Sequence, residues 1–108
     1  MGVVVVVEGY TVDESSGECS GSGEASEVAA GKTMVFVDVR TGDEVASVIL
    51  GAGVETGSGC RFDLGDPLGL DAAEYAEFIS VDPEFGELNV GGSTSFEGNT
   101  VVHRIENG

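Results

Sequence analysis

The sequence predicts an all-β fold: an antiparallel β-sandwich, immunoglobulin-like or related, of seven to eight short strands with one disulfide. Three observations support this prediction. The 108 residues include 18 glycines, and the apolar runs between them are rich in valine, whose branched Cβ suits a strand. Turn signals recur at short, regular intervals. No stretch has the apolar period of an amphipathic helix over three turns, so we expect a single β-sandwich domain over residues 1–108.

The opening apolar run predicts the first strand, over Val3 to Val12. Its first half is continuously apolar, which is typical of a strand covered on both faces. Five consecutive valines would promote aggregation on an open sheet edge. We therefore predict that residues 3–7 are paired along their length, either within the domain or across subunits. An acidic Gly/Ser loop follows over residues 13–31, with a helical turn expected over residues 25–30.

The clearest strand spans Thr33 to Val39, where side chains alternate between the two faces of a sheet. We assign the valine face of this strand to the core: Val35, Val37 and Val39. Met34 and Phe36 then lie on the opposite face.

The same alternation and the turn residues predict the rest of the chain. Further strands are expected over residues 45–50, 60–64, 75–81, 87–90, 93–96 and 100–105, with turns over residues 41–44 and 82–86 and a short helical turn over residues 71–74. In the strand over residues 60–64, the inward side chains are Cys60, Phe62 and Leu64. In the strand over residues 75–81, one face carries Tyr75, Ile79 and Val81.

The two cysteines, Cys19 and Cys60, both lie in polar Gly/Ser surroundings rather than in apolar runs. In a small β-rich chain this pattern indicates a structural disulfide and an oxidising compartment. Closing a loop of about 40 residues should stabilise the fold by roughly 4 kcal/mol in the chain-entropy model. The alternative is a pair of free, buried thiols in a cytosolic protein.

The charge is strongly one-sided, with 20 Asp and Glu against 4 Lys and Arg and a net charge of −16. Nucleic acid is disfavoured as a partner, because phosphate binding requires clustered cationic side chains. Three explanations of the charge remain open: a solvated, self-repelling surface, binding of divalent cations, or adaptation to high salt. No apolar run reaches the ~20 residues of a membrane-spanning helix, and we expect no membrane insertion within the chain.

Several motifs occur in a distinctive order around the cysteines: residues 19–23, 34–38, 50–53 and 60–64, followed by Tyr75. Over residues 10–81 this order resembles a family of small exported or lipid-anchored β-sandwich domains of actinobacteria, with a Cys-x-Gly-x-Gly loop and a Cys-x-Phe strand and no characterised function. The chain departs from that family at residues 24–27. The resemblance implies an extracellular or cell-surface domain with one disulfide, and it implies no activity.

The sequence offers no catalytic signature. The one histidine, His103, lies in the last expected strand between Val101 and Ile105, and no serine has the Gly-x-Ser-x-Gly surroundings of a nucleophile elbow. A zinc site would need His103 to meet both cysteines, and their spacing does not match known zinc motifs. We therefore expect no catalytic residues and no bound cofactor other than calcium.

Calcium is the metal that the composition favours, because Ca²⁺ prefers carboxylate and loop carbonyl oxygens. Three carboxylates in one Gly-rich stretch are the candidate ligands: Asp63, Asp66 and Asp71. Asp66, which precedes a proline, is equally well explained as a turn residue.

These observations favour a non-enzymatic, exported or cell-surface structural or interaction module, whose partner is an unidentified protein or a second copy. The alternative is a subunit of an extracellular filament assembled by strand exchange, since a continuously apolar terminal strand is what strand addition between subunits uses. A calcium-dependent binding module is the third interpretation.

Overall fold

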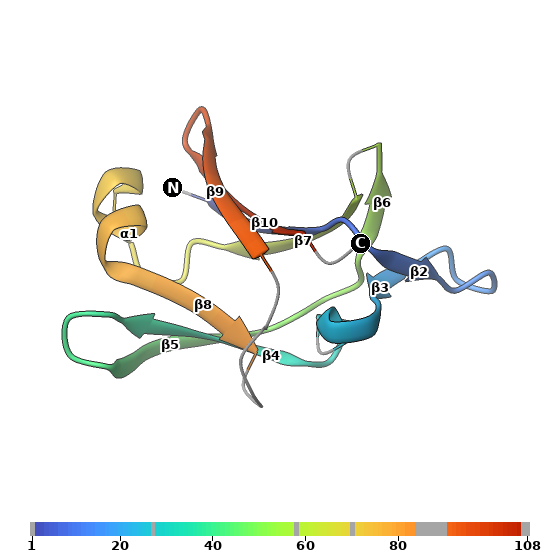
Figure 1. The fold of residues 1–108 in the computed structure, drawn as a ribbon, viewed down its shortest axis with the longest axis horizontal. Coiled ribbons are helices and arrows are strands. Elements are labelled where there is room, and N and C mark those ends of the chain that lie inside the picture. Colours follow the sequence, from blue (N-terminus) through green and yellow to red (C-terminus); the bar gives the residue numbers. More distant parts are fainter. Residues whose placement is uncertain (1, 27, 58, 70, 84–90, 107–108) are drawn as a thin grey trace.

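The structure is a computed structural model that describes residues 2–26, 28–57, 59–69, 71–83 and 91–106. The described residues form an all-β fold of ten strands with one short α-helix (Figure 1). The strands are β1 (Gly2–Val7), β2 (Tyr10–Val12), β3 (Cys19–Gly21), β4 (Thr33–Asp38), β5 (Asp43–Ile49), β6 (Val54–Thr56), β7 (Gly59–Gly65), β8 (Ile79–Pro83), β9 (Gly91–Glu97) and β10 (Thr100–Glu106). The helices are a 3₁₀ turn (Gly23–Ala25) and α1 (Ala72–Phe78).

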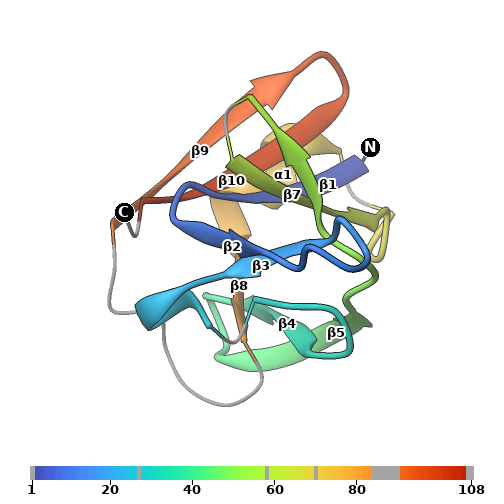
Figure 2. The same ribbon diagram turned by 90° about the vertical axis from the view of Figure 1, so that its right-hand side faces the viewer.

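Two sheets face each other across the core, as the sequence predicts for a sandwich. A five-stranded sheet in the order β6-β7-β1-β10-β9 lies over a three-stranded sheet in the order β5-β4-β8. Figures 1 and 2 show these two layers, with α1 at one end and the β2–β3 ribbon at the other. All pairings are antiparallel except one, because β1 runs parallel to β10.

The five valines of β1 occupy the centre of the larger sheet, between β7 and β10. Each is at most 4% exposed. Val3, Val5 and Val7 point into the core between the sheets, while Val4 and Val6 pack with Val102 on the outer face. The prediction that residues 3–7 are paired along their length is confirmed, and the pairing lies within the domain.

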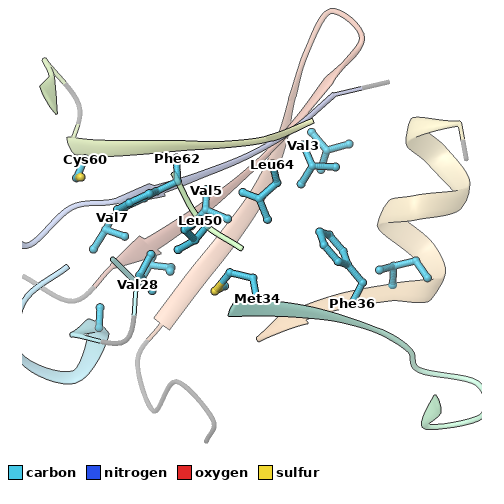
Figure 3. Packing of buried hydrophobic residues seen from close by; sticks show 14 of the residues in the cluster. Val3, Val5, Val7, Val28, Met34, Phe36, Leu50, Cys60, Phe62 and Leu64 are labelled. Atoms are coloured by element: carbon cyan, nitrogen blue, oxygen red, sulfur yellow. The ribbon is translucent and has the colours of Figure 1, made fainter. Parts of the chain in front are cut away.

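The core side of β4 was assigned to the wrong face by the sequence pattern. Met34 and Phe36 are 1% and 0% exposed, and Figure 3 shows them directed toward Leu50 and Leu64 in the core. The three valines lie on the outer side instead: Val35 and Val37 are half-buried and Val39 is 58% exposed. Both faces of this strand are apolar, so alternation alone does not identify the inner one. The larger Met and Phe side chains fill the space between two sheets better than valine does.

Tyr75 belongs to α1, not to a strand. The helix continues through Phe78, past the predicted turn over residues 71–74, and β8 begins only at Ile79. The carboxylate of Asp71 caps the helix by accepting a hydrogen bond from the backbone N–H of Glu74 at 2.8 Å. Tyr75 is fully buried, with its ring edge-on to Phe36 at a centroid distance of 6.1 Å.

Segments predicted as loops contain short additional strands. The expected strand over residues 3–12 is interrupted at residues 8–9 and forms β1 and β2. The long acidic loop contains β3 and the 3₁₀ turn. This turn ends at Ala25, where the predicted helical turn over residues 25–30 begins. The hairpin β4–β5 and the inward residues of β7 are confirmed. The strand expected over residues 87–90 lies outside the described residues. Among the described residues, no helix is long and apolar enough to cross a membrane.

Candidate functional site

The predicted disulfide is present between Cys19 in β3 and Cys60 in β7, with a Cα–Cα distance of 5.9 Å. Both residues are almost completely buried, at 3% and 0% exposure. The bond attaches the small β2–β3 ribbon to the larger sheet. A disulfide of this kind is compatible with an oxidising, extracellular environment.

Gly53 lies directly against this disulfide. Its carbonyl oxygen accepts a hydrogen bond from the backbone N–H of Cys19 at 3.2 Å. A Cβ atom at this position would approach Cys60 Sγ to 2.6 Å and the ring of Phe62 to 2.8 Å, and would collide with the carbonyl oxygen of Cys19. Only glycine lets the chain pass this close to the sulfur atoms.

His103 is held between two side chains. Its Nε2 atom lies 3.0 Å from the hydroxyl of Tyr75, and its Nδ1 atom lies 3.3 Å from Oγ1 of Thr94. The two groups come from α1 and β9, so the imidazole ties the helix to the larger sheet. Burial lowers the pKa of His103 below its ordinary value and raises the pKa of Tyr75. His103 therefore has a structural environment with both ring nitrogens engaged.

The three candidate calcium ligands each hydrogen-bond to their own turn. Asp63 Oδ1 accepts from the N–H of Gly65 at 2.9 Å, and Asp66 Oδ1 accepts from the N–H of Gly69 at 3.0 Å. Asp71 is the N-cap of α1. In the part of the chain that the structure describes, no group of three or more Asp, Glu, His or Cys side chains is placed to hold a metal ion. Calcium binding at these residues stays a prediction for a titration to test.

Among the described residues, a group of exposed apolar side chains lies on the outside of the smaller sheet, while Val12, Val54 and Phe96 are exposed elsewhere. We call this group the β4–β5 apolar surface, and its residues are Val35, Val37, Val39, Val45 and Ile49. Three of them are strongly exposed: Ile49 at 71%, Val39 at 58% and Val45 at 46%. Ile49 is opposite Thr33 in the ladder and so shares the outer face of Val35. Single exposed apolar residues are ordinary, but a contiguous group is typical of an interaction site.

Among the described strands, β5 is also an edge of its sheet, because it pairs with β4 alone. The N–H of Leu50 donates to the carbonyl oxygen of Lys32 at 2.8 Å, which fixes the phase of the ladder. Along an antiparallel strand the N–H and C=O groups of successive residues point alternately to one side and the other. Those of Val48, two residues before Leu50, therefore also point toward β4. Those of Ser47 and Ile49 point away from it, toward the open edge.

The charges around this edge are uneven. Asp43 and Glu44 are exposed at the start of β5. Arg40, in the turn before β5, is engaged elsewhere: its guanidinium makes two hydrogen bonds to Asp38, of 3.0 and 2.8 Å, and lies 4.0 Å over the ring of Phe78. Arg40 lowers the pKa of Asp38 through these bonds. The start of β5 is therefore negative and its far end is apolar.

No protein-family model matches the chain, and no curated protein or solved structure is significantly similar to it. The resemblance to actinobacterial exported domains therefore stays a prediction.

The β4–β5 apolar surface is the feature that the sequence analysis missed. Val35, Val37 and Val39, which the sequence pattern predicts to be core, lie on this surface instead. One signal was available: the two largest apolar side chains of the strand, Met34 and Phe36, share the other face. A strand with large residues on one face and β-branched residues on the other indicates which side fills a core.

Proposed function

We propose that the protein is a non-enzymatic module, exported or displayed at the cell surface, that binds another protein through the β4–β5 apolar surface. The observation that carries this proposal is the group of exposed valine and isoleucine side chains on the outer face of two neighbouring strands, β4 and β5. Ile49 alone is 71% exposed. Burying such a surface against a partner is favourable by roughly 25 cal/mol per Å² of apolar area.

The disulfide supports an extracytoplasmic location. Cys19 and Cys60 are paired and buried, and structural disulfides persist mainly in oxidising compartments. A domain of this size buries a modest share of its surface, so a covalent link that constrains the unfolded chain stabilises it usefully.

The environment of His103 supports a non-enzymatic role. General acid–base chemistry requires a group within reach of a substrate. Here the imidazole contacts Tyr75 and Thr94 within the protein's own framework, and this arrangement attaches α1 to β10 rather than presenting a reactive group.

Site-specific photo-cross-linking in the producing cell tests the binding surface. A photoreactive amino acid is placed at position 45 or 49 and, as a matched control, at Arg61, which is exposed on a strand of the other sheet. We expect cross-links to one heterologous protein, outside the cytoplasm, from positions 45 and 49 but not from position 61. Equal cross-linking at all three positions, or none at 45 and 49, would contradict the proposal.

A filament subunit assembled by strand exchange is the second candidate. β1 is the first strand of the chain, and it completes the larger sheet between β7 and β10. A β1 strand from a neighbouring copy would make the same contacts. Light scattering over a dilution series tests this candidate, because exchange produces oligomers whose amide protection over residues 3–7 is lost on dilution. A monomer with persistent protection excludes it.

Calcium dependence is tested separately by thermal unfolding with and without added CaCl₂. A midpoint that rises with calcium, and no longer does so in an Asp63→Asn/Asp66→Asn variant, would support the third interpretation. An unchanged midpoint would exclude it.

A further inference from the structure

We propose that β5 accepts an extended segment of a partner protein as an added strand, and that this segment carries Lys or Arg beside Asp43 and Glu44 and branched apolar residues beside Ile49. This inference rests on the proposed function and names the mode of binding and the chemistry of the partner.

The backbone of β5 has free hydrogen-bonding groups along its open edge. Ser47 and Ile49 direct their N–H and C=O groups away from β4, by the phase that the Leu50–Lys32 hydrogen bond sets. Each residue with this orientation offers a donor and an acceptor to a further strand. Peptide recognition by strand addition uses main-chain hydrogen bonds of this kind for affinity.

The side chains of β5 would contact those of an added strand on both faces of the sheet. On the outer face, Ile49 and Val45 would pack beside the alternate side chains of an added strand. On the inner face, Ala46 and Val48 are only partly buried where they pack against the core. The other side chains of an added strand would therefore extend the core. Branched apolar residues in the partner would therefore pack favourably on both faces of the added strand.

The charges of β5 determine at which end of the added strand its lysine or arginine side chains lie. Asp43 and Glu44 are exposed, and among the described residues neither carboxylate has an ion-pair partner. A partner with acidic residues at this end would be repelled, and one with Lys or Arg would form charge-assisted hydrogen bonds. Like-charge contacts at a strand edge also discriminate against unwanted pairing.

A second copy of the chain is a poor occupant. The strands at the edges of the two larger sheets are β5, β6, β8 and β9, and none of them contains a lysine or an arginine. Each copy also carries a net charge of −16, which opposes close approach of two copies at low salt. The cationic strand must come from a different protein.

The test uses three synthetic peptides of about eight residues. One carries two lysines at one end and valine along the rest, one carries two glutamates in place of the lysines, and the third is the Val/Lys peptide with two central prolines, which remove strand donors. Binding is measured by NMR on ¹⁵N-labelled protein with its disulfide intact, at about 0.05 and 0.5 M NaCl. We expect the Val/Lys peptide to bind at least tenfold more tightly than the other two, and to slow amide exchange at Ser47 and Ile49.

Two double variants separate local from global charge. In Asp43→Lys/Glu44→Lys the Val/Lys peptide should bind about tenfold more weakly, and the Val/Glu peptide should gain affinity. The control, Glu14→Lys/Glu18→Lys, changes the net charge equally but in the exposed loop before Cys19. It should leave the preference for Val/Lys unchanged.

Each remaining outcome overturns the inference in a recognisable way. Equal binding of the proline peptide would mean electrostatic adsorption without strand addition. Equal weakening in both double variants would mean that the charge preference is not located at β5. Protection of Ser47 and Ile49 that grows with protein concentration alone would identify a second copy as the occupant. If no peptide protects these amides while positions 45 and 49 still cross-link to a partner, the binding surface stands and strand addition is wrong.

Discussion

At the scale of single residues, Gly53 is the position where one carbon atom should matter most. A Cβ there would press on Cys60 Sγ and on the ring of Phe62. We expect Gly53→Ala to lower the free energy of unfolding by about 1–3 kcal/mol, the range typical of overpacking. Denaturant titration of the oxidised protein measures this loss.

Gly51→Ala is the matched control for that change. Gly51 is exposed, an added Cβ would have no neighbour within 4 Å, and its backbone lacks a positive φ. Its substitution should leave stability unchanged or raise it slightly by restricting the unfolded chain. Equal effects of the two substitutions would show that the contact with the disulfide is unimportant.

His103 should make stability depend on pH. Burial lowers its pKa in the folded state below the ordinary value of 6.5. The unfolded chain therefore binds more protons between these two pKa values, so the free energy of unfolding falls as the pH drops below about 6.5 and is highest above it. Denaturant titrations of the wild type and of His103→Gln across this window measure the difference in slope. A variant with the same pH slope as the wild type would exclude this role.

At the scale of elements, β4 gives the sharpest test of the core. Met34→Asp should unfold the domain, because an unpaired charge among fully buried side chains costs several kcal/mol. Val35→Asp should remain folded, since Val35 is half-buried on the outer face. Circular dichroism and thermal melts of the two variants decide the matter. A folded Met34→Asp protein would mean that the two faces have been exchanged.

The strands differ in how clearly their sequence patterns predict their place in the fold. β1 and β7 were predictable because each pattern allows only one placement of its side chains. Five adjacent valines must be covered on both faces of a sheet, and Phe62 and Leu64 alternate with charged residues, which identifies the inner face. β4 was not predictable in this way, because both of its faces are apolar. Tyr75 was predicted in a strand because a seven-residue helix is too short to show a helical apolar period. The signal for the helix is its N-cap, Asp71, whose carboxylate accepts a hydrogen bond from the N–H of Glu74. The β4–β5 apolar surface follows from that choice of face, for which the only local signal is the larger size of Met34 and Phe36.

At the scale of the whole molecule, charge should make stability rise with salt. A net charge of −16 on 108 residues repels itself in the compact state, and the Debye length falls from about 10 Å at 0.1 M salt to about 3 Å at 1 M. Thermal melts of the oxidised protein in NaCl over this range should show a rising midpoint. A midpoint that is flat or falls would contradict the repulsion argument.

The disulfide should contribute a large part of the total stability. Cys19 and Cys60 are 41 residues apart in the sequence, and opening a loop of this size should cost roughly 4 kcal/mol in the chain-entropy model. Denaturant titration of a Cys19→Ala/Cys60→Ala variant against the oxidised wild type measures the difference. A loss below about 1 kcal/mol would mean that the unfolded chain is already compact without the bond.

The parallel pairing of β1 with β10 has a consequence for how the chain folds. Val3 lies opposite Val101, so the central strand finds one of its two neighbours only at the far end of the described chain. Topologies dominated by such distant pairings fold slowly, because the entropy of closing a long loop is lost before any contact compensates for it. During synthesis the valine run can pair with β7 once residue 65 has been made, but its other edge has no partner until β10 is complete. Until β10 is made, this apolar strand has an open edge, which promotes aggregation with other chains.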